Sequence, residues 1–370
     1  MVTRVSLLSD YKRIVIKIGS AILVEDGRLR EDWLDALCAD IARLRESGAT
    51  VTLVSSGAIA LGCQTLGLDR SSLSLAQKQA CAAVGQSLLT RGYDDSLQGY
   101  GIRAAQALLT LDDTEVRRRY LNARATLTTL LDLGVVPIVN ENDTVATAEI
   151  RYGDNDRLAA RTAQMLGADL LILLSDVDGL YTADPRANSD AKHLPVIEAI
   201  TDDHMAMASG VNEEAGVGSG GMATKLIAAR IATAAGCDMI VCDGRSAGAI
   251  AALDHGAKHT LFKAESEPRK ARAQWIAGSL SPVGDIIIDD GAVSALRSGK
   301  SLLAAGLSGL SGTFGKGDTV RILTQSGDAM AIGLTAYDSR DLDAVMGLRS
   351  EQIAHPAGPV VVHRDNLVMT

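Results

Sequence analysis

The chain of 370 residues is 47% hydrophobic and 22% charged, and it contains 36 glycines. This composition excludes an intrinsically disordered chain and is typical of a globular α/β protein with many glycine turns, while the length predicts roughly two to three domains. The net charge of −9 argues against a nucleic acid or an anionic membrane as the main partner, although one small basic pocket is compatible with it.

The first 265 residues alternate between short apolar runs and helical patterns. Continuous apolar strands between helices indicate a largely parallel sheet that is covered on both faces. Ligands bind beyond the carboxyl ends of the strands in such sheets, so we expect the polar motifs that follow these strands on one rim. Strands are predicted at 13–19, 50–57, 104–110, 135–139, 169–174 and 238–242. Helices are predicted from the spacing of Trp33, Leu34, Leu37, Ile41 and Leu44, and at about 113–133, 155–167 and 222–236.

The pattern changes near residue 265. A polar stretch ending in Ser-Pro-Val-Gly is followed by short alternating segments with glycine turns, as in "SGTFGKGDTVRILTQSGDAMAIGL". Such segments predict a second, β-rich domain. The expected organisation is a first domain at 1–265, a linker at 266–280, the β-rich domain at 281–360 and a C-terminal tail at 361–370.

The cysteines and the N-terminus indicate the compartment. The five cysteines are widely spaced and contain no Cys-x-x-Cys pair, which favours reduced core thiols over a disulfide framework or a zinc site. The charged Asp10, Lys12 and Arg13 precede the first apolar run, so no signal peptide is expected. No stretch approaches the roughly 18 uninterrupted apolar residues of a membrane span. We therefore expect a cytoplasmic, soluble protein.

A lysine within an apolar strand is the first candidate for chemistry. Lys17 lies in "IVIKIGSA", where its ammonium must reach either solvent or an anion. A strand-end lysine that extends to solvent and a phosphate-binding lysine explain this position about equally well. Gly19 and Ser20 follow, and they can bring backbone N–H groups close to an anion beside that ammonium. This favours a phosphate lysine.

Three later segments combine glycine with hydroxyl groups after a strand. "VSSGAIALG" can bind an anion, but by itself an ordinary helix cap by one of its serines, such as Ser56, explains it better. "LSDVDGLYTADPR", which contains Ser175 and Asp176, is by itself a plain turn with aspartate capping. "GVGSGGMATK" instead favours a backbone that wraps phosphates over a flexible loop, with Lys225 at the start of a helix.

Acidic and amide side chains are concentrated directly after the strand predicted at 135–139. The segment "NENDTVATAEIRYGDNDRLAA" at 140–160 carries five carboxylates and three asparagines but only two arginines. A solvated loop is the simplest explanation of this segment alone. Two lysines and three Gly/Ser segments, however, supply positive potential for a polyphosphate. The acids and amides can then position the lysines, meet magnesium through water and hold the charged groups of a small zwitterion.

Together these motifs resemble the amino acid kinase family over nearly the whole chain. "KIGSA", "SSGAIALG", "LNARATL", "PIVNENDTVATAEIRYGDNDRLAA", "SDVDGLYTADPR" and "GVGSGGMATK" occur in the order of that family, and the NEND and GDND pair is the most specific. The C-terminal region resembles a PUA domain. The resemblance implies an α/β fold, an αβα sandwich with a mainly parallel eight-stranded sheet, followed by a small β-rich PUA-like domain.

The resemblance also implies roles for individual residues. Lys17 and Lys225 would contact the ATP phosphates and the transferring phosphoryl group, and Asp156 would hold the two lysines in place. Glutamate would be bound by Ser56, Asp143 and Asn155. No metal ligand is assigned, because Mg²⁺ would be held mainly by the phosphates of the co-substrate ATP. The nucleotide would be bound by Lys17, Ser175, Asp176, Ser219, Gly220, Gly221, Met222, Ala223, Thr224 and Lys225.

The implied activity is ATP-dependent phosphorylation of the side-chain carboxylate of L-glutamate to L-glutamyl 5-phosphate, the first step of proline biosynthesis. Such family members are commonly inhibited by proline and form dimers or tetramers, and functional coupling to glutamyl 5-phosphate reductase is a further expectation. One alternative is a related kinase that acts on aspartate, acetylglutamate, carbamate or a nucleotide. The other is RNA binding through the PUA-like domain, but residues 281–370 hold seven basic and ten acidic side chains, and this net charge of −3 disfavours nucleic acid.

Overall fold

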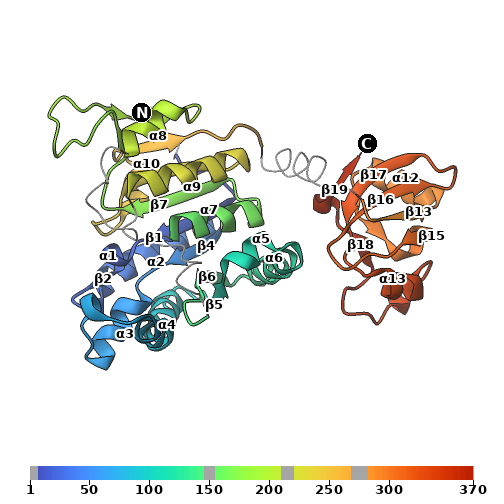
Figure 1. The fold of residues 1–370 in the computed structure, drawn as a ribbon, viewed down its shortest axis with the longest axis horizontal. Helices are drawn as coiled ribbons and strands as arrows, with labels where there is room; N and C mark the ends of the chain where they lie inside the picture. The colour runs from blue at the N-terminus through green and yellow to red at the C-terminus, as the bar shows by residue number, and fades with distance from the viewer. Residues whose placement is uncertain (1–6, 146–154, 210–220, 268–281, 370) are drawn as a thin grey trace. The chain divides into compact units, whose positions relative to one another are not determined.

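The computed structural model describes residues 7–145, 155–209, 221–267 and 282–369. The chain forms two compact units, Met1–Pro268 and Arg269–Thr370 (Figure 1). The division falls inside the stretch for which the sequence predicts a linker, and most of that stretch lies outside the described residues.

The first unit is built on one sheet of eight strands in the order β10-β12-β11-β7-β1-β4-β6-β5. Neighbouring strands run parallel except for β11 and β12, which are antiparallel. The expected mainly parallel eight-stranded sheet is therefore confirmed. The strands are β1 (Arg13–Ile18), β4 (Thr50–Ser55), β5 (Ala104–Leu109), β6 (Val136–Glu141), β7 (Leu170–Ser175), β10 (Val196–Ile197), β11 (Asp238–Asp243) and β12 (His259–Phe262).

Helices cover both faces of this sheet, as expected for an αβα sandwich (Figure 1). Successive side chains of a strand point to opposite faces. Accordingly, Ile14, Ile16 and Ile18 of β1 pack in a core with α2, α3, α4 and α10, whereas Val15 packs in a second core with α6, α7 and α9. The helices are α2 (Glu31–Glu46), α3 (Ala58–Leu66), α4 (Leu75–Gln98), α6 (Arg117–Asp132), α7 (Asn155–Leu166), α9 (Met222–Ala234) and α10 (Ala249–Asp254).

Helix α4 is the largest element that the sequence analysis did not predict. It is 24 residues long and crosses α3 at two glycines. A Cβ atom on Gly62 would lie 1.8 Å from the carbonyl oxygen of Cys81, and one on Gly85 would lie 1.7 Å from that of Ala58. These glycines are required for close helix contact, although glycine within a sequence pattern usually lowers the expectation of a helix.

Shorter elements complete the first unit. The helix predicted at about 113–133 is interrupted at Val116, whose φ of −76° and ψ of 112° are extended, so α5 and α6 are separate helices. The strands β10 and β12 were missed because they are only two and four residues long. The remaining elements are α1 (Ser20–Leu23), β2 (Val24–Glu25), β3 (Arg28–Leu29), η1 (Arg70–Ser72), α5 (Leu111–Glu115), β8 (Leu180–Tyr181), β9 (His193–Leu194) and α8 (Asp202–Ser209).

The second unit is β-rich, as predicted. A sheet in the order β15-β13-β16-β17-β19 encloses a hydrophobic core of its own, and β14 pairs separately with β18. Strand β13 ends at Ile288, because Asp289 caps the following helix α12 by accepting a hydrogen bond from the backbone N–H of Ala292 at 2.7 Å. The elements are β13 (Gly284–Ile288), α12 (Asp290–Arg297), β14 (Leu302–Leu303), η2 (Ala304–Gly306), β15 (Leu307–Gly312), β16 (Thr319–Thr324), β17 (Ala329–Leu334), α13 (Ser339–Val345), η3 (Ser350–Gln352), β18 (Val360–Val362), η4 (Arg364–Asn366) and β19 (Leu367–Met369).

The end of the chain belongs to this second unit, which corrects the separate tail expected at 361–370. Strand β18 pairs with β14, and β19 pairs with β17. Val361 and Val362 are completely buried in the core. The two strands are only three residues long, so their pairing depends on contacts that are distant in the sequence.

All five cysteines are buried and none forms a disulfide, as the sequence indicated. Burial raises the pKa of Cys38 to about 12 and that of Cys63 to about 11, so both thiols are neutral near pH 7.

Along the described residues, no helix combines the length and the apolar character needed to cross a membrane.

Candidate active site

Polar segments gather at the carboxyl ends of the central strands, as predicted for a parallel sheet. The backbone joins them across neighbouring strands. The N–H of Ser56, after β4, donates to the carbonyl of Ile18, at the end of β1, at 3.1 Å. The N–H of Gly244, after β11, donates to the carbonyl of Ser175, at the end of β7, at 2.7 Å. The parallel pairing of β1 with β7 joins these two pairs, so the four strand ends form one continuous rim.

Two lysines that are 208 positions apart share one carboxylate at this rim. The Nζ of Lys17 lies 2.5 Å from Oδ1 of Asp156, and the Nζ of Lys225 lies 3.4 Å from Oδ2 of the same residue. The exposed fractions of the three side chains are only 9%, 5% and 0% for Lys17, Lys225 and Asp156. Lys17 therefore does not extend to bulk solvent, and this excludes one of the two explanations left open by the sequence.

The fold explains why these three side chains meet. Lys17 is two residues beyond Val15 in β1, so it points to the face covered by α7 and α9. Asp156 is in the first turn of α7, where the helix dipole favours a negative charge, and Lys225 is in the first turn of α9. A buried lysine at a helix N-terminus is unfavourable on both counts unless a carboxylate compensates it. Asp156 supplies that compensation.

A second group of polar side chains forms a hydrogen-bonded network beside the lysine cluster. The side-chain Nδ2 of Asn155 donates to Oγ of Ser56 at 2.7 Å and to Oδ1 of Asn140 at 2.9 Å. It also lies 3.3 Å from the carbonyl oxygen of Ser55. Asn155 and Asp156 are consecutive, so the network and the lysine pair are held by the same turn of α7. The sequence analysis named Ser56 and Asn155 but assigned no role to Asn140.

Asp143 lies two residues beyond the end of β6 and is partly buried. The backbone N–H of the preceding residue, Asn142, donates to the carbonyl of Leu109 at the end of β5 at 2.8 Å. This anchors the start of the turn that carries Asp143 to the same rim as the asparagine network.

The residues expected to bind the nucleotide lie on two elements. Ser175 ends β7, and its hydroxyl donates to Oδ1 of the exposed Asp176 at 3.0 Å. Helix α9 begins after Gly221, which as a glycine has no side chain with which to cap the first N–H groups. The hydroxyl of Thr224 donates to the carbonyl of Gly221 at 2.7 Å within that first turn. Ser219 and Gly220 lie outside the described residues.

The loop after β11 belongs to the same rim, although the sequence analysis assigned no role to it. Trp33 donates from its ring N–H to the carbonyl of Gly244 at 2.8 Å. Arg30 donates to the carbonyl of Ile22 at 2.8 Å and to that of Arg245 at 3.1 Å, so it joins the segment after β1 to this loop. The sequence feature that could have indicated this loop is Gly244, a glycine directly after a buried strand.

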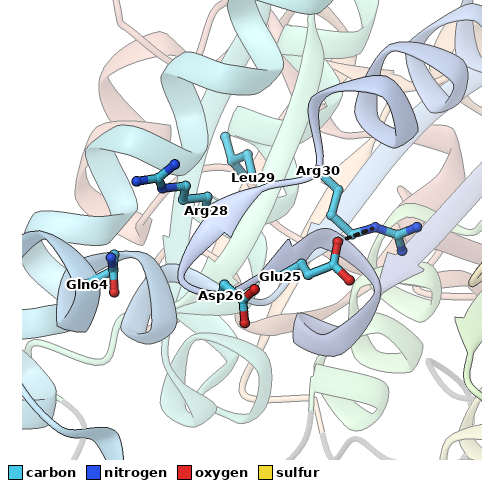
Figure 2. Close-up of a pocket in the computed structure, with 6 residues that line it drawn as sticks. All are labelled: Glu25, Asp26, Arg28, Leu29, Arg30 and Gln64. Carbon is cyan, nitrogen blue, oxygen red and sulfur yellow. Dashed lines mark ion pairs between the residues drawn. The ribbon is translucent and has the colours of Figure 1, made fainter.

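A separate open cleft lies next to the hairpin of β2 and β3. Figure 2 shows Glu25 directed toward the guanidinium of Arg30, with 3.9 Å between Oε2 and Nε. The loop with Ser56 packs on this hairpin, because a Cβ atom on the left-handed Gly57 would lie 2.9 Å from a methyl group of Val24. None of the lysine cluster lines this cleft, so we assign no chemistry to it. The lining residues are Glu25, Asp26, Arg28, Leu29, Arg30 and Gln64.

Comparison with known families agrees with this architecture. The model of the amino acid kinase family matches residues 12–243, and that of the PUA domain matches residues 284–357. The chain belongs to the amino acid kinase family and carries a PUA domain. It is therefore a phosphotransferase.

The chain is similar to several named relatives over nearly its whole length. It is 54% identical to the glutamate 5-kinase of Caulobacter vibrioides strain NA1000, covering 97% of this chain and 96% of the relative. It is 53% identical to the glutamate 5-kinase of Brucella ovis, covering 98% and 97%.

Two solved structures are similar in fold. A UMP kinase from Ureaplasma parvum is 16% identical, with a TM-score of 0.46, and covers 68% of this chain and 98% of its own. A carbamate kinase from Giardia lamblia bound to AMP-PNP is 19% identical, with a TM-score of 0.47, and covers 70% and 100%.

Proposed function

We propose that this enzyme transfers the γ-phosphoryl group of ATP to the side-chain carboxylate of L-glutamate, forming L-glutamyl 5-phosphate. The observation that carries the proposal is the buried cluster in which Lys17 and Lys225 meet at Asp156. The names of the relatives, glutamate 5-kinases at 53–54% identity over nearly the whole chain, support the choice of acceptor.

The chemistry depends on charge more than on proton transfer. The side-chain carboxylate of free glutamate has a pKa of about 4.3, so it is already an ionised nucleophile near pH 7 and needs no general base. The obstacle is the approach of this anion to a highly charged polyphosphate. Two ammonium groups held in a site of low exposure offset that repulsion and stabilise the charge of the transferring phosphoryl group. Asp156 fixes both ammonium groups before the substrates arrive.

The network beside the lysines suits the amino acid end of glutamate. Ser56 accepts a hydrogen bond from Asn155, so its own hydroxyl hydrogen can be donated to a carboxylate of the substrate. Asp143 supplies a counter-charge for the α-ammonium group. The side-chain carboxylate of the bound glutamate would then face the lysine cluster.

The nucleotide would occupy the other half of the rim. The N–H groups at the start of α9 favour phosphate, and Ser175 and Asp176 offer polar groups at the end of β7. Ser219 and Gly220 are proposed for the same role from the sequence motif.

Magnesium would enter with ATP and be held mainly by its phosphates. Both carboxylate oxygens of Asp156 are engaged by ammonium groups, so this residue fits the role of orienting the lysines and does not offer itself to a metal. The exposed carboxylate of Asp176 can reach such an ion through water. When bound, magnesium supplies further positive charge for the phosphates.

A substrate panel tests the proposed acceptor. ATP consumption is measured with glutamate, aspartate, acetylglutamate, carbamate and UMP as acceptors. We expect turnover with glutamate to exceed that with each of the other compounds by about tenfold or more in kcat/KM. Acetylglutamate, carbamate and UMP lack the α-ammonium group with which the site would pair. Aspartate keeps both charged groups but is one methylene shorter, so its side-chain carboxylate would not reach the lysine cluster. A preference for any other acceptor would contradict the proposal.

The place in metabolism follows from the product. An acyl phosphate is reactive, and we propose that a reductase consumes glutamyl 5-phosphate in proline biosynthesis and is functionally coupled to this enzyme. Proline is proposed as a feedback inhibitor, and a homodimer or homotetramer as the assembly. Turnover measured with and without proline, together with the mass of the protein in solution, checks both. Unchanged turnover at saturating proline would refute the inhibition.

Replacing Asp143 by alanine is expected to raise the KM for glutamate by about ten- to a hundredfold, because it removes the counter-charge for the α-ammonium group. The KM for ATP should stay within about twofold. Asp132→Ala, at the exposed end of α6 ahead of β6, is the matched control and should leave both values unchanged. If Asp143→Ala weakened ATP binding instead, its assignment to the glutamate site would be wrong.

A further inference from the structure

A chain of buried side-chain amides leads from α4 to the proposed glutamate site. The Nδ2 of Asn140 donates to Oε1 of Gln86 at 2.8 Å, and Oδ1 of Asn140 accepts from Nδ2 of Asn155 at 2.9 Å. The backbone N–H of Glu141 also donates to Oδ1 of Asn140 at 2.9 Å. Gln86 and Asn140 are exposed by only 6% and 3%. Neither residue is among those proposed above to bind glutamate.

Each amide in this chain sets the orientation of the next. A side-chain amide donates from its nitrogen and accepts at its oxygen, so reversing it exchanges the two functions. Gln86 accepts from the nitrogen of Asn140, and the backbone N–H of Glu141 donates to the oxygen of Asn140, so this oxygen is the atom that accepts from Asn155. The nitrogen of Asn155 then faces three acceptors, namely Asn140, Ser56 and the carbonyl of Ser55. The oxygen of Asn155 is thereby turned away from this group.

This orientation decides the polarity of the site. With its nitrogen directed at Ser56, Asn155 presents its oxygen as an acceptor for an ammonium group. Ser56 accepts from Asn155 and so presents its hydroxyl as a donor to a carboxylate. A reversed Asn155 would offer a donor to the ammonium group and compete for the hydroxyl hydrogen of Ser56. The observed orientation matches a zwitterionic amino acid.

We propose that Gln86 is a positioning residue that fixes the amide orientation of Asn140 and Asn155 and thereby the affinity for the amino acid substrate. This inference rests on the proposed function. It adds a residue of α4, outside every motif that the sequence analysis singled out, to the determinants of substrate binding. Gln86 acts through Asn140, and its acceptor oxygen is the group that matters.

A role in packing alone has a different signature. Gln86 is adjacent to Gly85, where α4 touches α3, so a change there can loosen the helix pair. Loosening would lower stability and turnover without distinguishing between the substrates. Loss of the acceptor would instead raise the KM for glutamate selectively, because only the amide chain toward Asn155 is released.

Three variants of Gln86 separate these roles in the full-length chain. Gln86→Met keeps the approximate volume but removes the acceptor, and we expect it to raise the KM for glutamate by about tenfold while the KM for ATP stays within about twofold. Gln86→Asn keeps a neutral amide that is too short to reach Asn140, and the same selective increase is expected. Gln86→Glu keeps an acceptor oxygen at the same reach, and its KM for glutamate should stay within about threefold of the unaltered enzyme.

A control variant and defined contrary results complete this test of Gln86. Ser87→Ala changes the next residue of α4, an exposed serine whose hydroxyl donates to Val84 of the same helix, and it should leave both KM values unchanged. The role of Gln86 is overturned if Met and Asn variants that fold normally leave the KM for glutamate unchanged, or if both KM values rise together. A Glu variant as impaired as the Met variant also overturns it. If the unaltered enzyme shows no glutamate-dependent turnover, the proposed function itself fails.

Discussion

Replacing Lys225 by alanine should reduce kcat by about a hundred- to a thousandfold, the loss typical of removing one preorganised group that stabilises transition-state charge. The ammonium of Lys225 is nearly buried and already held 3.4 Å from Asp156, so it needs little reorganisation when the phosphoryl group is transferred. Lys17 contacts the other oxygen of the Asp156 carboxylate, so its ammonium does not take the place of the ammonium lost from Lys225. We therefore expect little compensation.

The fold should survive this change. Without Lys225, Asp156 keeps its contact of 2.5 Å with Lys17, so the buried carboxylate retains a counter-charge. Thermal unfolding monitored by circular dichroism, beside steady-state kinetics, separates the two effects. Lys12→Ala is the matched control, because Lys12 is an exposed lysine just before β1, at the end of the strand opposite to Lys17. Near-normal kcat in a folded Lys225→Ala variant would show that the residue has no part in phosphoryl transfer.

The sequence predicted the central strands and the positions of the two lysines well, for a physical reason. A parallel sheet buried on both faces requires continuous apolar strands, and a lysine in such a strand stands out. The residues next to Lys17 in the sequence could not decide whether its side chain extends to solvent or turns inward. The answer depends on Asp156 and Lys225, which are 139 and 208 positions away.

Other features were not predicted because their cause lies in tertiary contacts. Gly85 is a helix-contact residue in α4, yet glycine alone indicates flexibility. Gln86 looks like any polar residue of an amphipathic helix until Asn140 is placed beside it. The last strands of the second unit are three residues long and become recognisable only through their partners β14 and β17.

Replacing Asp156 by asparagine should have the largest combined effect, because it removes the carboxylate that both lysines contact while keeping the shape of the side chain. Two nearly buried ammonium groups would then face a neutral amide in place of the carboxylate. Breaking a buried ion pair by removing one partner typically costs about 3–5 kcal/mol of unfolding free energy. We expect a loss of stability in that range and a loss of kcat of at least about a hundredfold, since the lysines are no longer held for the phosphoryl group.

The same argument predicts an unusual response to the nucleotide. Polyphosphate supplies the negative charge that the variant lacks, so ATP with magnesium should raise the midpoint of thermal unfolding more in Asp156→Asn than in the unaltered enzyme. Asp95→Asn is the control: Asp95 is exposed and pairs with Arg91 on the surface of α4, where such pairs contribute little. Two results would show that Asp156 is not the electrostatic anchor of Lys17 and Lys225. One is that Asp156→Asn is as stable as the unaltered enzyme without ATP. The other is that ATP raises the unfolding midpoint of Asp156→Asn no more than that of the unaltered enzyme.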